Sequence, residues 1–295
     1  TELKHTFTEF AQRMKNDEMI TLAKFLAISG IILPMLPHKN LIPDINLTPY
    51  SIWLATVVVS GISYLSYLLK RYVFHESGTL VSGIIGGLYS STATISVLAR
   101  KSRKASEQEA TDYVAAMLLA VSMMFLRFMI LILIFSREIF LSIYPYLLTM
   151  AVVAAIVAWF IHSRQKRPED QPAETEEDDS SNPLEFKVAL IFAVLFVIFT
   201  FLTHYTLVYA GTGGLNLLSF VSGFSDITPF ILNLLQNTGS VAALIITACS
   251  MQAIISNIMV NMFYALFFAG KGSKLRPWIL GGFGVVITCN LVLLL

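Results

Sequence analysis

Long apolar blocks, rather than an alternation of apolar and polar residues, dominate the pattern along this 295-residue chain. A helix of about 20 apolar residues crosses a hydrocarbon core about 30 Å thick. The blocks therefore predict an all-α polytopic membrane protein with about seven transmembrane helices. The predicted spans cover residues 21–36, 52–69, 113–135, 139–162, 186–208, 240–270 and 278–295.

Two further stretches, residues 78–99 and 213–236, are long enough to cross, but glycine, proline and many hydroxyl side chains interrupt them. Lys and Arg concentrate in short cytoplasmic loops. If each stretch enters and leaves on one side, only Lys39 and Arg137 lie in the opposite loops. The basic residues that then share the cytoplasmic face are Lys70, Arg71, Arg100, Lys101, Arg103, Lys104, Arg164, Lys166, Arg167, Lys271, Lys274 and Arg276. We predict two re-entrant, broken-helix segments, a cytoplasmic N-terminus and a C-terminus outside.

The polar stretches divide the chain into segments. Near the N-terminus, Phe7, Phe10 and Met14 recur at helical spacing among charged residues, the pattern of an interfacial amphipathic helix. The acidic stretch before the fifth span is interpreted as a solvated cytoplasmic linker, or alternatively as a loop that collects cations. The predicted segments are residues 1–20 (interfacial helix), 21–47 (first span), 48–162 (repeat one), 163–182 (acidic linker) and 183–295 (repeat two).

Three motifs recur in the two halves at nearly constant spacing. Thr48-Pro49 matches Asn182-Pro183 at an offset of 134 residues, the run from Gly87 matches that from Gly223 at 136, and Arg127 matches Asn261 at 134. Three crossings per half would place the halves in opposite orientations, which predicts an inverted repeat. This is a common plan of secondary transporters, whose broken helices meet near the membrane midplane. The alternative is two helical hairpins that bury each other without transporting anything.

Only two charged side chains, Arg127 and Asp226, lie deep in the predicted apolar segments, where an ionisable residue indicates function. The candidate substrate or ion site comprises Ser90, Ser91, Thr92, Thr94, Arg127, Ser222, Ser225, Asp226, Thr228, Asn257 and Asn261. Asp226 among hydroxyls could hold Na⁺ or Mg²⁺ as a metal ligand, or couple a proton. The structural alternatives are an Arg127–Asp226 ion pair, close helix packing by Ser and Thr, and interhelical hydrogen bonds from the asparagines.

Composition narrows the class of protein. The chain is only 13% charged, against about 25% in an average soluble domain, and its mean hydropathy is +0.71. A net charge of +1 gives no reason to expect a nucleic-acid partner, and Cys249 and Cys289 have no metal-site spacing. Since no nucleophile–base pair, phosphate loop or zinc motif occurs, we expect neither an enzyme nor an organic cofactor.

The favoured function is transport of a small ion or polar solute through the bilayer, by alternating access around a midplane site. Two alternatives stay open: a regulatory or scaffolding membrane domain that works through an attached module, and a passive cation channel with a continuous pore. A homodimer is compatible with each of these functions.

Several motifs carry a family resemblance. They are Leu33-Pro34-Met35-Leu36-Pro37, Leu47-Thr48-Pro49-Tyr50-Ser51, the run from Gly83 to Thr94, Met124-Phe125-Leu126-Arg127 and Ser222-Gly223-Phe224-Ser225-Asp226. With them the chain resembles the uncharacterised multispanning domain found C-terminal to MgtC/SapB modules in bacterial membrane proteins. The resemblance implies a bacterial inner-membrane location and an N-terminal MgtC/SapB-like module in the full-length protein. The chain departs from the family pattern at Thr228, where an Asp is common, and at Asn261, where a Lys is common, which weakens a two-carboxylate metal site.

Overall fold

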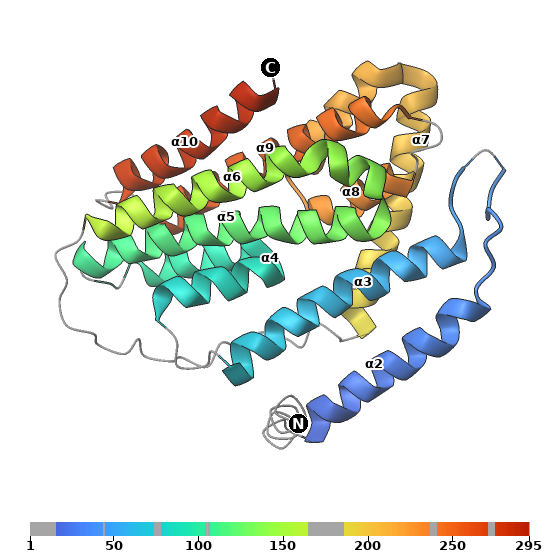
Figure 1. Cartoon of the computed structure of the whole chain (residues 1–295), viewed down its shortest axis with the longest axis horizontal. Coiled ribbons are helices and arrows are strands. Elements are labelled where there is room, and N and C mark those ends of the chain that lie inside the picture. Colours follow the sequence, from blue (N-terminus) through green and yellow to red (C-terminus); the bar gives the residue numbers. More distant parts are fainter. Residues whose placement is uncertain are drawn as a thin grey trace.

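Every regular element in the described part of the chain is a helix. The computed structural model describes residues 16–43, 45–73, 78–103, 105, 107–164, 186–236, 241–270 and 275–294. The helices, shown in Figure 1, are α2 (Asn16–Met35), α3 (Pro49–Leu68), the π-helical turn η1 (Leu69–Val73), α4 (Thr79–Lys101), α5 (Glu107–Phe135), α6 (Arg137–Ser163), α7 (Phe186–Ser222), α8 (Ile227–Gln236), α9 (Ala243–Ala269) and α10 (Arg276–Leu294).

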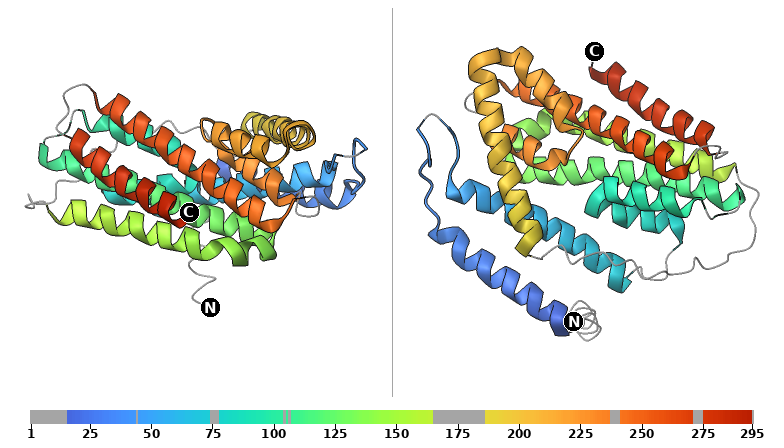
Figure 2. Two further views of the ribbon diagram at one scale, coloured as in Figure 1. Left: turned by 90° about the horizontal axis from the view of Figure 1, so that it is seen from above. Right: turned by 180° about the vertical axis from the view of Figure 1, so that it is seen from behind.

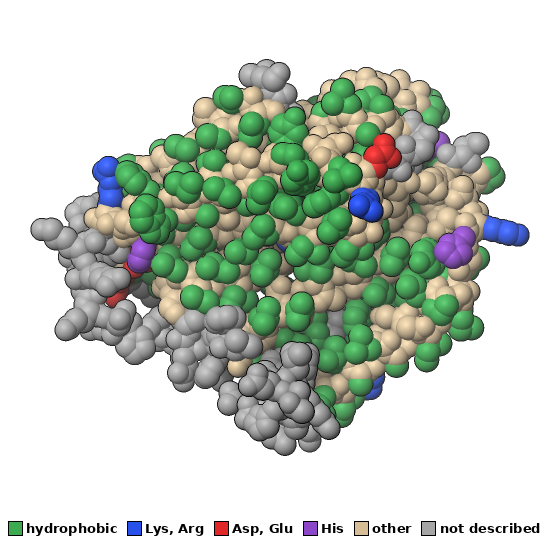
Figure 3. Space-filling view, viewed as in Figure 1, with side chains coloured by type: hydrophobic (Ala, Val, Ile, Leu, Met, Phe, Trp, Pro, Cys, Tyr) green, Lys and Arg blue, Asp and Glu red, His purple; other side chains and the backbone are tan. Residues whose placement is uncertain are grey.

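Eight of these helices are long and apolar enough to cross a membrane: α2 to α7, α9 and α10. Apolar side chains also spread over most of the face seen in Figure 3, with few charged ones among them. Since lipid rather than water suits such a surface, the prediction of an all-α polytopic membrane protein is confirmed. Seven of the eight helices correspond to the seven predicted spans, and the eighth, α4, is the first predicted broken segment.

The helix α4 is broken at its centre and turns back on itself. Ser90 has an extended backbone (φ −159°, ψ 107°), and a Cβ built on Gly86 would lie 2.5 Å from Oγ1 of Thr94. In a continuous helix residues eight apart are separated by about 12 Å along the axis. The two pieces must therefore lie side by side, as Figure 2 (right) shows. Although α4 as a whole is long and apolar enough to cross, neither of its two pieces is, so the fold agrees with the predicted re-entrant segment.

The second broken segment begins inside α7. Gly211 has φ 60° and ψ −153°, a conformation that glycine adopts readily, and the chain then continues as a short helical piece over residues 212–222. A turn at residues 223–226 leads into α8, whose 10 residues reach only about 15 Å. The break at Gly211 thus separates the predicted span, residues 186–208, from the second predicted broken segment, residues 213–236.

The two broken segments enter the bundle from opposite ends. The first piece of α4 runs along α5 from its start toward its middle, because Gly83 lies against Ala116 and Gly87 against Ala120. Residues 212–222 run in the same way along α9. Cys249 contacts Asn216 (Sγ–Oδ1, 3.4 Å), and further along α9 Oγ of Ser256 donates to the carbonyl of Phe220 (2.7 Å).

We call the turn in the middle of each broken segment its tip and the opposite end its base. Contacts at the two bases fix these directions. At the base of α4, Arg103 donates to the carbonyl of Phe267 near the end of α9 (3.1 Å), and Arg100 stacks over the Phe268 ring at 4.7 Å. The base of α8 lies at the other end, where Nε2 of Gln236 donates to the carbonyl of Ser51 in the first turn of α3 (3.4 Å). The start of α5 thus lies beside the end of α9, and the two tips point toward each other.

Matching packing contacts support the interpretation as a repeat. A Cβ on Gly87 would lie 2.5 Å from Cα of Ala120, and a Cβ on Gly223 would lie 2.3 Å from Cβ of Ser256. The members of each pair are separated by 33 positions (120 − 87 and 256 − 223). Only glycine allows these close approaches, which are typical of membrane helix interfaces. The same contact therefore fixes each broken segment to the helix that follows it.

Several predicted boundaries need correction. Helix α2 begins at Asn16 and is continuous to Met35, so residues 16–20 belong to the first span and not to a separate interfacial helix. The rest of that predicted helix, residues 1–15, lies outside the described residues, as do residues 165–182 of the predicted linker. Helix α5 begins before the apolar block, at Glu107, because polar residues extend the helix beyond it.

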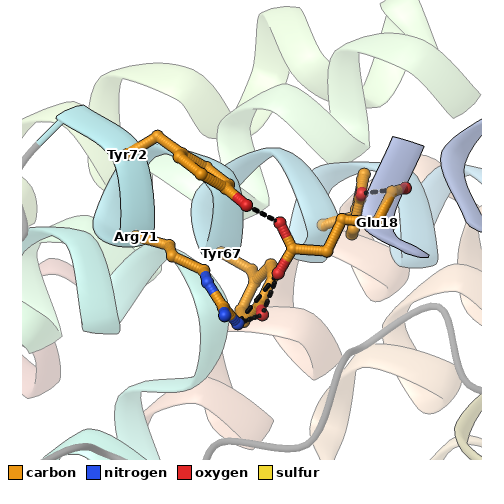
Figure 4. A network of polar contacts seen from close by, with 5 residues as sticks. Glu18, Tyr67, Arg71 and Tyr72 are labelled. Carbon is orange, nitrogen blue, oxygen red and sulfur yellow. Dashed lines mark hydrogen bonds and ion pairs between the residues drawn. The ribbon is translucent and has the colours of Figure 1, made fainter. Parts of the chain in front are cut away.

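Helix α2 is attached to the bundle at its start by a polar cluster. Only 11% of its apolar window is buried, against 56% for that of α5. The carboxylate of Glu18 forms an ion pair with Arg71 (2.8 Å) and accepts hydrogen bonds from the hydroxyls of Tyr67 (2.9 Å) and Tyr72, as Figure 4 shows. The Glu18 side chain is only 8% exposed, so a charged residue that lies outside the predicted apolar segments is buried as well.

Candidate functional site

The tips of the two broken segments meet at a cavity of about 430 Å³. Helices α3, α5, α7 and α9 complete its wall. The polar side chains on the wall are Ser60, Ser63, Tyr89, Ser90, Ser91, Thr92, Arg127, Ser225, Asp226, Thr228, Asn257 and Tyr264. Eight of the eleven predicted site residues are among them, although they come from distant parts of the sequence.

Arg127 binds the end of the first half of α4. Its Nη1 donates to the carbonyl of Tyr89 at 2.8 Å, at the helix end where carbonyls lack intrahelical partners and carry partial negative charge. The residue is only 9% exposed and lines the cavity. Arg127 thus holds the tip of α4 in place from α5, while its guanidinium faces the cavity.

Asp226 lies in the turn at the other tip and caps α8. Its Oδ1 accepts from the backbone N–H of Thr228 at 2.9 Å, the arrangement of an N-cap carboxylate. Asp226 is close enough for its charge to act on Arg127, yet within the described residues no ion pair joins the two side chains. The predicted alternative of a direct structural ion pair is therefore absent from this structure.

The tip of α4 is built from hydroxyl residues because the backbone is interrupted there. Oγ of Ser90 accepts from the backbone N–H of Ala93 (3.3 Å) and so caps the second half of the helix. Ser91 and Thr92 follow in the first turn of that half and line the cavity. The hydroxyl-rich sequence thus serves both to begin a new helix within the membrane and to supply polar groups to the wall.

Asn257 on α9 binds the second tip, as Arg127 on α5 binds the tip of α4. Its Nδ2 donates to the carbonyl of Gly223 at 3.1 Å, and its Oδ1 accepts from Nδ2 of Asn261 at 3.1 Å. Both alternatives for Asn257 therefore hold, since it forms interhelical hydrogen bonds and also lines the cavity.

Three of the predicted residues lie off the cavity wall. Thr94 packs against Gly86 within α4, Ser222 donates to the carbonyl of Ser219 (2.7 Å), and Asn261 is buried behind Asn257. These side chains support the tips, and the structure does not bring them to the wall.

Sequence analysis missed Ser60 and Ser63, which carry the contribution of α3 to the cavity. Both are buried, as are Thr56 and Ser66 on the same helix. Spacings of three or four residues place these four side chains on one helix face. This polar stripe was a signal in the sequence, but packing by small residues would give the same pattern.

The wall offers little to a metal ion. Asp226 is the only acidic side chain on it, and the described residues contain no group of three or more His, Cys, Asp or Glu that could hold a metal. Ca²⁺ in proteins takes about six to eight oxygen ligands, carboxylates among them, and Mg²⁺ usually keeps several of its waters. The lone carboxylate and a cavity of this size suit a hydrated or organic solute better than a bare divalent ion.

Comparison with known proteins gives a family but no function. A protein described as "Uncharacterized protein" from Aquifex aeolicus (strain VF5) is 24% identical over 227 residues, which cover 75% of this chain and 96% of that protein. No solved structure matches the chain. The expected likeness to an uncharacterised family is confirmed, but an association with MgtC/SapB modules is not shown. The model of a domain of unknown function, DUF4010, matches residues 57–269, and the chain therefore belongs to the DUF4010 family.

Proposed function

We propose that this protein is a membrane transporter of a small polar solute, and that it works by alternating access around the cavity between the two tips. The observation that carries the proposal is the meeting of two half-crossing segments, which enter from opposite ends, at one polar cavity. Backbone interrupted at membrane depth needs partners for its polar groups, and it persists where protein or water supplies them. Secondary transporters use this arrangement to bind solutes at helix ends.

The cavity differs from the rest of the interior in charge. Among the described residues of its wall, Arg127 and Asp226 are the only two that carry a charge at neutral pH, and they come from different halves of the chain. A rocking of one half against the other would change their separation and would open the cavity to each side in turn. Close backbone contacts at Gly83, Gly87 and Gly223 pack each broken segment against the helix that follows it, so that each half can move as a unit.

The location follows from the distribution of charge. The basic residues at the ends of α3, α4 and α6 and the start of α10 favour the cytoplasm for that end of the bundle. This orientation gives a cytoplasmic N-terminus, an outside C-terminus and, in a bacterium, the inner membrane.

Alternating access can be tested without knowing the solute. In a background of Cys249→Ala and Cys289→Ala, Thr92→Cys places a thiol on the cavity wall. We expect a membrane-impermeant thiol reagent to label it from either side of sealed proteoliposomes. Ser219→Cys is the matched control, because Ser219 is fully buried away from the cavity and should stay unlabelled.

The outcomes separate the candidate functions. Labelling of Thr92→Cys from neither side would contradict transport and favour a scaffold with a dry centre. Labelling from one side only would contradict alternating access as well. Steady ion currents through the reconstituted protein in a planar bilayer would instead indicate a channel.

A further inference from the structure

We propose that the solute is a small zwitterion, which places its carboxylate at Arg127 and its ammonium group at Asp226. This inference rests on the proposed transport function and names the chemical class of the solute. Three features carry it: a guanidinium with free donors, a helix start beside it, and a separated carboxylate across the cavity.

Arg127 has unused hydrogen-bonding capacity. Nη1 donates to Tyr89, but Nε is buried without any partner. Within the described residues no other hydrogen bond or ion pair reaches the guanidinium. A buried donor without a partner costs about 1–3 kcal/mol, and a guanidinium fork matches the two oxygens of a carboxylate. A carboxylate in the cavity would bind the guanidinium through Nη2, which makes no hydrogen bond in the described part of the chain and is not among the buried unpartnered atoms.

The second half of α4 adds to the positive side. It begins directly after Ser90, next to the carbonyl that Arg127 binds, and Ser91 and Thr92 of its first turn line the cavity. The start of a helix carries partial positive charge and free N–H groups, which favour an anionic group. Arg127 and this helix start therefore converge on the same part of the wall.

Asp226 supplies the negative side. Only Oδ1 is engaged, by the backbone N–H of Thr228, which leaves Oδ2 free in the described structure. The two opposite charges lie on different tips and make no ion pair with each other, so the buried Arg127 lacks a counter-charge, while the exposed Asp226 is accessible to a ligand. A solute with one charge would satisfy only one of them, whereas a zwitterion satisfies both.

The cavity has room for an organic molecule. Its 430 Å³ falls within the range of about 300–1,000 Å³ for small-molecule sites. Apolar side chains, among them Val59, Phe128, Phe192 and Leu195, line the wall between the polar groups. Such a wall suits the short carbon chain that joins a carboxylate to an ammonium group.

The test compares zwitterionic probes with probes that carry a single charge. Ligand-induced stabilisation of the purified full chain is measured as a rise in its melting temperature. The zwitterionic probes are glycine, β-alanine and γ-aminobutyrate, whose charges lie progressively further apart. The probes with a single charge are propionate and propylamine, which share the three-carbon chain of β-alanine. We expect at least one zwitterion to stabilise the protein and neither single-charge probe to match it.

Variants then assign each end of the probe. Arg127→Gln and Asp226→Asn should each weaken binding of that zwitterion about tenfold or more, since each removes a charge-assisted contact. Asparagine is a good N-cap, so Asp226→Asn removes the charge and keeps the cap. Arg127→Lys retains a positive charge and should bind more tightly than Arg127→Gln. Arg137→Gln and Glu138→Gln, exposed neighbours at the start of α6, should bind like the parent.

Two results would overturn the proposal. Equal stabilisation by propionate or propylamine would show that one charge suffices, and no stabilisation by any zwitterion would show that the class is wrong. Because the thiol-labelling test uses no solute, a protein labelled from both sides that ignores zwitterions would remain a transporter of another substrate.

Discussion

Replacement of Gly83 by alanine tests how α4 is fixed to α5. A Cβ at this position would lie 2.3 Å from the carbonyl oxygen of Ala116, whereas an ordinary contact begins at 3.4 Å, so the pieces must separate by about 1.1 Å. The obstacle is backbone, which cannot rotate away as a flexible side chain would. Overpacking of this kind costs about 1–3 kcal/mol.

The packing cost of Gly83→Ala has to be separated from the gain in helix propensity that alanine brings. Alanine is better than glycine inside a helix by about 1 kcal/mol, so the net effect of Gly83→Ala alone understates the packing term. Gly61→Ala on α3 is the matched control, because a Cβ there meets nothing within 4 Å. We therefore expect Gly83→Ala to be less stable than Gly61→Ala by about 1–3 kcal/mol.

The free energy of unfolding can be followed by circular dichroism as the fraction of a denaturing detergent in mixed micelles is raised. Displacement of α4 should also shift Tyr89 away from Arg127, so Gly83→Ala should change thiol labelling at Thr92→Cys, while Gly61→Ala should not. If the two glycine variants unfold at the same detergent fraction, the close approach of α4 to α5 is wrong.

Two further predictions concern the attachment of α2 and the break in α7. Glu18→Gln removes the ion pair with Arg71, so amide hydrogen exchange in α2 should become faster. Global stability should change little, because α2 buries little of its surface. Lys24→Gln is an exposed control on the same helix, and equal exchange rates in the two variants would contradict this prediction. Gly211→Ala should cost about 1–3 kcal/mol in backbone strain, because Gly211 has φ 60°. Gly213→Ala is the control and should not destabilise the protein, since a Cβ at either position meets nothing within 4 Å. Equal unfolding curves for the two variants would exclude the break at Gly211.

The sequence by itself determined the class of protein, the position of nearly every span and which two segments are broken, although not that the backbone breaks at Ser90 and Gly211. Hydropathy over about 20 residues decides whether a segment enters lipid, and it is a local property. The signal for a broken segment is local as well, because glycine and hydroxyl residues lie within the segment itself. The clustering of basic residues at one end of the bundle also followed from loop composition alone.

Tertiary structure alone decided which side chains share the cavity. An ion pair of Arg127 with Asp226 was one of the alternatives left open by the sequence, but in the structure Arg127 binds the carbonyl of Tyr89, because the half-helix of α4 ends beside it. Ser60 lies on the wall and Thr94 does not, although both are hydroxyl residues in apolar segments. The rotation of each helix about its axis decides this, and that rotation depends on contacts such as Gly83 with Ala116 between segments distant in sequence. Hydropathy carries no information about such contacts, since lipid and the protein interior are equally apolar.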